Sequence, residues 1–138
     1  MTTGTLGTNA RQDPRQVVNT LKKTINWNDA ASGTALPFDN YLPKGAFITR
    51  VLVEVVTAFN GTTPSVVVGT NSATYNNMVA AGDVNEVATG VYDATRALGR
   101  ALAASADVLP YVIYSNGGGS PSTGQAVIVI QYEGGWTT

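Results

Sequence analysis

Apolar and polar side chains alternate along several short segments of the chain. In residues 21–27 (LKKTINW), Leu21, Lys23, Ile25 and Trp27 share one face, and the opposite face is entirely polar. A period of two places successive side chains on opposite faces of an extended chain. This segment is therefore predicted to be a strand.

Residues 46–59 give the clearest strand pattern. One predicted face carries Phe47, Val51, Val53, Val55 and Phe59. The other, more mixed face carries Ile48, Arg50, Leu52, Glu54 and Val56. β-branched residues dominate, and they favour a pleated surface over a helix. Because Asn60-Gly61 is a strong turn signal, residues 65–70 are predicted to return as the second strand of a hairpin.

Weaker patterns fill the rest of the chain. Residues 34–38 are predicted to be a short edge strand because they contain Pro37. Residues 78–81 allow one helical turn, which Gly82 and Asp83 would end. The segment after residue 90 is ambiguous, and a short strand at residues 91–95 followed by an Ala-rich loop or helical turn is one interpretation.

Two further strands are predicted near the end of the sequence. Residues 107–116 and 124–135 alternate in the manner of a partly buried sheet, and a glycine-rich connection suggests that they form a second hairpin. Pro110 indicates an edge or a bulge near the start of the first. The total of seven or eight short strands with frequent turn signals predicts an all-β sandwich or barrel.

The first part of the chain differs from the rest. Residues 1–15 are polar, rich in Gly, Thr and Asn, and without a period, which predicts a flexible N-terminal arm that orders only against a partner. A frayed end without a role is the alternative. Residues 16–138 are predicted to form a single β-sandwich domain, a normal size for one folding unit.

Composition excludes several classes of function. Charged residues make up only 12% of the 138 residues and the net charge is −1, so there is no basic surface with which to bind nucleic acid. A surface this poor in charge suits contact with other protein. The chain has no Cys and no His, which excludes disulfides, the usual zinc sites and any His-dependent catalytic triad. We therefore expect no enzyme activity, no cofactor and no metal.

The sequence shows neither a secretion signal nor a membrane segment. The first residues lack an apolar stretch, and Arg50 and Glu54 interrupt the most apolar run. The chain is expected to be made in the cytoplasm and to remain soluble.

Several acidic residues are candidate site residues. Asp83, Asn85 and Glu86 resemble a fragment of a calcium loop, but the remaining ligands are missing and a polar turn is favoured. Asp29 and Asp39 could form a catalytic carboxylate pair, yet both lie in turn-like segments where Asp is common.

Basic, glycine-rich and aromatic segments offer other candidates. Arg96 and Arg100 are either contacts to an acidic patch on a partner or ordinary exposed charges. GGGSPSTG lacks the Lys of a phosphate loop. Tryptophan and tyrosine side chains could build a sugar-binding platform, although core or subunit contacts are favoured. They are Trp27, Tyr41, Tyr75, Tyr92, Tyr111, Tyr114, Tyr132 and Trp136.

The block YLPKGAFITRVLVEVVTAFNGTTPSVVVGT, followed by MVAAGDVN, TGVYD and GQAVIVIQY, resembles small virion proteins of tailed bacteriophages. Within that group it looks like head decoration (cement) proteins or related head-fibre modules. The resemblance covers residues 27–133 and omits the N-terminal arm. It implies a β-sandwich, of jelly-roll type, and assembly into symmetric oligomers.

This resemblance implies a structural role on the virion. The expected protein binds the outer capsid surface, with the major capsid protein or other virion proteins as partners, and forms a homo-oligomer, with a trimer favoured. Candidate subunit contacts are Trp27, Trp136, Arg11 and Arg15. A head-fibre or tail-associated module that binds a host surface glycan is the alternative, and a hydrolase without His or Cys is a third.

Overall fold

A computed structural model describes residues 18–73, 75–94, 96 and 98–134. Within these residues the chain forms seven strands and no helix. The strands are β1 (Val18–Asn26), β2 (Ala35–Pro37), β3 (Ala46–Thr57), β4 (Ser65–Gly69), β5 (Gly90–Ala94), β6 (Tyr111–Ser115) and β7 (Gln125–Gly134). The all-β prediction is therefore confirmed.

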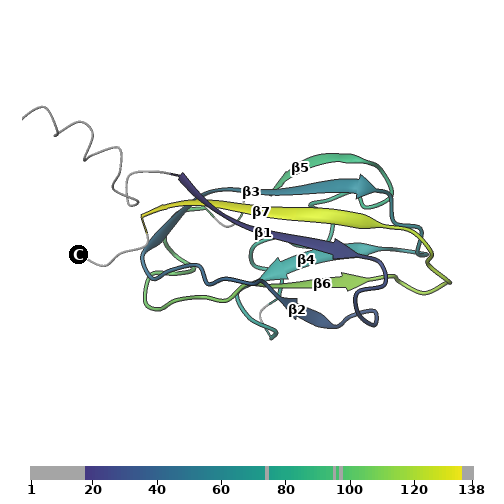
Figure 1. Cartoon of the computed structure of the whole chain (residues 1–138), viewed down its shortest axis with the longest axis horizontal. Coiled ribbons are helices and arrows are strands. Elements are labelled where there is room, and N and C mark those ends of the chain that lie inside the picture. Colours follow the sequence, from purple (N-terminus) through teal and green to yellow (C-terminus); the bar gives the residue numbers. More distant parts are fainter. Residues whose placement is uncertain (1–17, 74, 95, 97, 135–138) are drawn as a thin grey trace, which may run out of the picture.

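The strands form two antiparallel sheets that lie face to face (Figure 1). Sheet A has the order β1-β7-β3-β5, and sheet B has the order β2-β6-β4. Two stacked sheets that each have one apolar face bury those faces against one another. The fold is a β-sandwich, as the strand spacing predicted.

Alternating side chains of both sheets form the core between them. In sheet A the inward residues include Leu21, Ile25, Val51, Val53, Val55, Ala126, Ile128 and Ile130. Sheet B contributes Val66, Val68, Val112 and Tyr114. The pattern of residues 21–27 therefore identified the inward positions of β1 correctly. Trp27, just beyond the strand, is half-buried and packs against the edge of this core.

Both predicted hairpins are wrong. β3 and β4 belong to different sheets, and so do β6 and β7. The two connections cross from one sheet to the other at the same end of the sandwich, where the amides of Thr62 and Thr63 donate to the carbonyls of Gly118 and Asn116. A turn signal such as Asn60-Gly61 marks where a strand ends, but it carries no information about which sheet receives the next strand.

The predicted faces of β3 hold from Val51 onward but fail at its start. The side chain of Ile48 is 1% exposed and that of Phe47 is 51% exposed, the reverse of the predicted assignment. The pairing of β3 with β7 shifts register between Ile48 and Arg50, so one extra residue enters β3 there. Such a bulge exchanges the two faces of the strand.

Other local predictions have mixed outcomes. Pro37 lies in β2, an edge strand of sheet B, as predicted. The helical turn that the composition of residues 78–81 would allow does not form, and Val79 instead forms an isolated bridge with Val68. Pro110 does not mark an edge strand, since it precedes β6, the middle strand of sheet B.

Candidate functional site

The free edge of β4 is covered by side chains and backbone of the segment that follows it. The amide of Val66 donates to Oε1 of Glu86 at 2.8 Å, and the amide of Thr70 donates to Oδ1 of Asn77 at 3.1 Å. Between them, the amide of Val68 donates to the carbonyl of Val79 at 2.9 Å. An exposed row of strand amides invites pairing with another chain. Here three alternate amides of that row are already occupied.

Glu86 is a buried carboxylate with a structural partner. Its residue is 7% exposed. Burial raises the pKa of Glu86 above its ordinary value, against the lowering effect of the hydrogen bond from Val66. The Glu86 carboxylate accepts a hydrogen bond at the edge of β4. It is therefore not available as a ligand in the calcium loop considered from the sequence.

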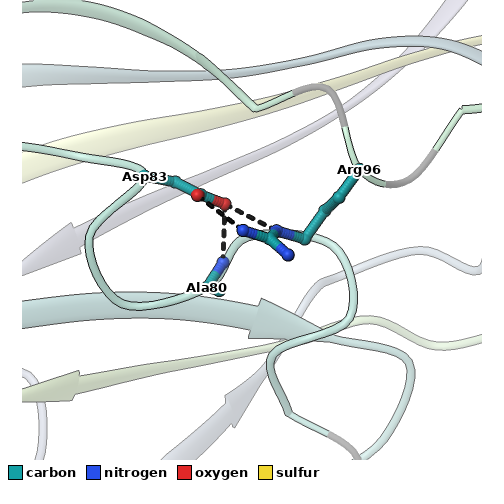
Figure 2. Close-up of polar contacts among 3 residues, drawn as sticks. All are labelled: Ala80, Asp83 and Arg96. Atoms are coloured by element: carbon teal, nitrogen blue, oxygen red, sulfur yellow. Dashed lines mark hydrogen bonds and ion pairs between the residues drawn. The ribbon is translucent and has the colours of Figure 1, made fainter.

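Asp83 binds the Arg96 side chain and its own loop (Figure 2). Nε and Nη2 of Arg96 donate to the two carboxylate oxygens at 2.8 and 2.7 Å, and the amide of Ala80 donates to Oδ2 at 2.9 Å. The hydrogen bond from Arg96 is the main reason why the pKa of Asp83 lies below its ordinary value. Two-point pairing of this kind fixes the geometry of both groups.

These contacts bear on two hypotheses from the sequence, the calcium loop at Asp83 and Glu86 and the role of Arg96 and Arg100. Asp83 and Glu86 have separate partners, and the described part of the chain contains no group of three potential metal-ligating side chains. Arg96, considered as a contact to an acidic patch on a partner, is paired within its own chain, whereas Arg100 is exposed.

The two candidate catalytic carboxylates also have separate partners. Asp29 accepts a 2.7 Å hydrogen bond from the backbone amide of Asn26 and so closes the turn after β1. Oδ1 of the exposed Asp39 lies 3.7 Å from Nζ of Lys23, whose side chain is partly buried. Neither contact joins Asp29 to Asp39, and the turn interpretation accounts for the position of Asp29.

The aromatic side chains have different environments. Tyr114 is buried, and its ring centroid lies 4.8 Å from that of Phe59. Burial raises the pKa of Tyr114. Tyr92 and Tyr132 pack partly against the core, whereas Tyr41 is exposed. Several of the proposed platform residues are thus core residues, as favoured from the sequence.

A polar groove at one end of the sandwich was not predicted. It has a volume of about 310 Å³ and lies where β1 and β3 end and β7 begins, on the right in Figure 1. Its lining consists of Asn26, Trp27, Asn28, Thr57, Ser122, Thr123, Gly124 and Gln125. Sequence reasoning missed it because three segments far apart in the sequence build it.

The glycine-rich connection forms one wall of this groove. Oδ1 of Asn60 accepts hydrogen bonds from the amides of Ser122 and Thr123 at 2.8 and 3.1 Å. Nδ2 of Asn60 donates to Oγ of Ser122 at 2.9 Å. These two loop amides are therefore used within the chain and do not form a phosphate-binding loop.

The outer face of sheet A carries a mixed apolar surface. Register places Leu52 beside Val129 and Glu54 between Val127 and Val91, and the residue Val91 is 62% exposed. We call Leu52, Val91, Val127 and Val129 the outer apolar patch. Arg50 and Asp93 form an exposed ion pair of 3.3 Å at its border.

Three of the four predicted subunit contacts fall outside the described residues: Arg11, Arg15 and Trp136. The fourth, Trp27, lines the groove and has a half-buried side chain. In the part of the chain that the structure covers, no helix is long and apolar enough to cross a membrane.

No family model and no curated protein matches the sequence. The fold, however, is similar to chains in three solved capsid structures. The cyanophage Pam1 capsid asymmetric unit contains a chain with a TM-score of 0.65 and 18% identity, covering 83% of this chain and 83% of that one.

The other two similarities are of comparable extent. A chain in the capsid of Ralstonia phage GP4 has a TM-score of 0.58 and 22% identity, covering 88% of this chain and 86% of that one. A chain in the acid-stable capsid of Helicobacter pylori bacteriophage KHP30 has a TM-score of 0.56 and 20% identity, covering 84% and 86% respectively. At these identities the similarity is one of fold.

Proposed function

We propose that this chain is a structural virion protein of a tailed phage that binds the outer capsid surface as a decoration or cement protein. One observation carries the proposal: at least 83% of this chain matches at least 83% of a chain in each of three phage capsid structures. The shared unit thus covers most of each neighbour chain.

The strand order supports a jelly-roll topology as part of this proposal. A jelly roll has eight strands in two sheets. Sheet A supplies one complete set of four, whereas sheet B has three strands. The bridge between Val68 and Val79 lies on the free side of β4, where an eighth strand would add to sheet B. We infer that the segment around Val79 is a reduced form of that strand.

The proposed mechanism is mechanical and needs no catalytic group. A decoration protein bridges neighbouring capsid subunits and buries surface that would otherwise be hydrated, so rupture of the shell requires those contacts to break as well. The outer apolar patch offers apolar area for such contacts, with Glu54 lying within it and the Arg50–Asp93 ion pair at its border. Weak contacts repeated around a symmetric shell add up to firm attachment.

The oligomer that we propose is a homotrimer. Cyclic symmetry allows one protein to contact several capsid subunits equivalently. The N-terminal arm of residues 1–15, with Arg11 and Arg15, is proposed to extend the contact to a neighbouring subunit or to the shell. Light scattering on residues 1–138 and on a shortened chain that starts at Gln16 tests this part: the mass of a trimer is expected for the full chain, with weaker association after shortening.

Particles that lack the protein provide the main test. Virions made without this gene product are expected to release their DNA at a lower temperature, and addition of the purified full chain is expected to restore the original release temperature. Sedimentation of the added protein with the particles measures binding directly. Particles that neither bind the protein nor differ in release temperature would refute the decoration role, and a few copies per particle would favour a fibre or tail position.

A further inference from the structure

The groove beside Trp27 has the dimensions of a small-ligand site. Its volume of about 310 Å³ is at the lower end of the range of roughly 300–1,000 Å³ typical of such sites. Another hollow among the described residues, lined by Ile25 and Tyr114 among others, has about 10 Å³ and room for no more than one water molecule. The groove is therefore the better candidate for a binding site.

The lining of the groove is polar but uncharged. Side-chain amides come from Asn26, Asn28 and Gln125, and hydroxyl groups come from Thr57, Ser122 and Thr123. Amides and hydroxyls both donate and accept hydrogen bonds, which matches the hydroxyl groups of a polyol. A phosphate or carboxylate ligand would find no cation among these residues.

Trp27, whose side chain is half-buried, contributes the aromatic ring of this lining. An indole ring presents an apolar face together with a single N–H donor. A pyranose ring has the matching character, because its axial C–H bonds form an apolar face and its hydroxyl groups point outward around the rim. One aromatic ring beside several amides thus suits a neutral sugar better than a purely apolar ligand or an ion.

Hydrogen bonds within the chain hold the walls of the groove in place. The amide of Trp27 donates to the carbonyl of Gly124 at 3.0 Å, and Nε2 of Gln125 donates to Oδ1 of Asn26 at 3.0 Å. Nδ2 of Asn26 is directed to Asp29, at 3.4 Å from Oδ1 and 3.5 Å from Oδ2. Because these groups are already ordered, less conformational entropy is lost when a ligand binds.

Several polar groups of the lining have no such contact. Among the described residues, neither the side-chain amide of Asn28 nor Oε1 of Gln125 has a hydrogen-bond partner within the chain. Both are available to a ligand. They lie on opposite segments, one after β1 and one at the start of β7, so a single ligand could contact both.

We propose that this groove binds a neutral saccharide, with Trp27 stacking on the sugar ring and Asn28 and Gln125 bonding its hydroxyl groups. The inference does not rest on the decoration role, because it concerns the isolated chain. A small open groove gives weak binding, with Kd on the order of 1 mM per site. Repetition over many copies on a particle would convert such weak binding into firm attachment to a glycan-covered surface.

Titration of ¹⁵N-labelled full chain with saccharides, followed by ¹H–¹⁵N NMR, tests the proposal. The neutral probes are maltotriose, cellotriose and triacetylchitotriose, and a heparin tetrasaccharide is the charged comparator. At least one neutral probe is expected to shift the indole N–H of Trp27 and the side-chain amides of Asn28 and Gln125 in a saturable manner. Comparison of each trisaccharide with its monosaccharide distinguishes an extended glycan from a free sugar as the ligand.

Variants separate groove binding from general effects. Trp27→Ala is expected to weaken binding by about tenfold, equivalent to about 1.4 kcal/mol. Asn28→Ala, an exposed change that leaves the core intact, is expected to weaken it severalfold, and Tyr41→Ala, an exposed aromatic outside the groove, is expected to have no effect.

Three results would overturn the proposal. The first is the absence of saturable shifts with every neutral probe. The second is binding that Trp27→Ala and Asn28→Ala leave unchanged, or that only the charged tetrasaccharide produces. The third is a loss of oligomer mass in Trp27→Ala, since Trp27 would then be a contact between copies and the groove would be closed in the assembly. None of these results bears on whether the protein stabilises capsids.

Discussion

The backbone amide of Val66 donates a 2.8 Å hydrogen bond to the carboxylate of Glu86, and this contact closes the outer edge of β4. Val66 is itself fully buried. A buried amide that loses its acceptor incurs the cost of desolvation without compensation. The carboxylate thus has a role in the fold that its polar sequence neighbourhood did not indicate.

Removal of this acceptor is expected to destabilise the protein. Glu86→Ala leaves the Val66 amide unpaired and should lower the free energy of unfolding by about 1–3 kcal/mol, as measured by urea denaturation. Glu86→Gln keeps a carbonyl acceptor and is the matched control, with a smaller loss. Equal losses in the two variants would show that the charge of Glu86, and not its hydrogen bond, is what matters.

Stability should respond to pH in opposite senses at Glu86 and Asp83. Burial raises the pKa of Glu86 above its ordinary 4.5, so the folded state binds the proton more tightly than the unfolded state. Its contribution to stability is present in full below the unfolded pKa and is lost as pH rises through the raised folded pKa. The pKa of Asp83 is lowered from 3.8, so its contribution is present above 3.8 and is lost as pH falls through the lower folded pKa.

Urea denaturation between about pH 7 and about pH 3 measures both effects. On acidification the Glu86 contribution is gained first, and the Asp83 contribution is lost only at the acid end. Glu86→Gln should remove the gain and keep the later loss. Asp83→Asn should remove the later loss, and it should also lower stability at neutral pH because Arg96 loses its charged partner. Parallel pH curves for all three proteins would contradict this assignment.

Gly124 is expected to tolerate no side chain. A Cβ atom at this position would overlap the ring of the buried Phe59, and the backbone has a φ of 145°, which favours glycine. Gly124→Ala should therefore lower the free energy of unfolding by more than about 2 kcal/mol.

Gly82→Ala is the matched control for Gly124→Ala. Its φ of 96° carries the backbone penalty, but a Cβ atom there would meet no atom within 4 Å. A loss of only about 1 kcal/mol is expected. If both variants unfold at the same urea concentration, backbone conformation alone accounts for the requirement at Gly124.

The bulge in β3 predicts contrasting effects at two adjacent residues. Ile48→Ala should cost about 2–5 kcal/mol because it leaves a cavity in the core. Phe47→Ala should change stability by less than about 0.5 kcal/mol because the Phe47 side chain lies at the surface. Thermal unfolding of the two variants measures the difference, and a larger loss at Phe47 would place the bulge elsewhere.

Local patterns predicted the individual strands better than their arrangement. The alternation of apolar and polar residues predicted β1 and β3. The missing backbone N–H of proline predicted that Pro37 lies in an edge strand. The bulge after Ile48 could not be predicted in this way, because a single inserted residue leaves the β propensity of the segment unchanged. The hairpin errors have a similar cause: Asn60-Gly61 specifies a turn, whereas the sheet that β4 joins depends on packing across the whole molecule.

The contacts of the candidate site residues could likewise not be predicted from local sequence patterns. The sequence correctly favoured a turn for Asp83 and Glu86, but the ion pair of Asp83 with Arg96 joins two loops whose approach no spacing rule gives. The groove could be recognised only after the ends of β1 and β3 had been brought to the start of β7. For Trp27 the sequence suggested a subunit contact or, less favoured, part of a sugar platform, and the structure shows only that its half-buried side chain lines the groove.

The position of β7 has a consequence for synthesis in the cell. β7 lies between β1 and β3 in sheet A, yet it is the last described strand to leave the ribosome. At about 5–20 residues per second, β1 and β3 wait on the order of seconds without their shared partner. During that interval their backbone amides and apolar faces are open to other nascent chains. At high expression levels, nascent chains are therefore expected to aggregate before they fold. Slower translation should not reduce this aggregation, because it lengthens the time before β7 is synthesised.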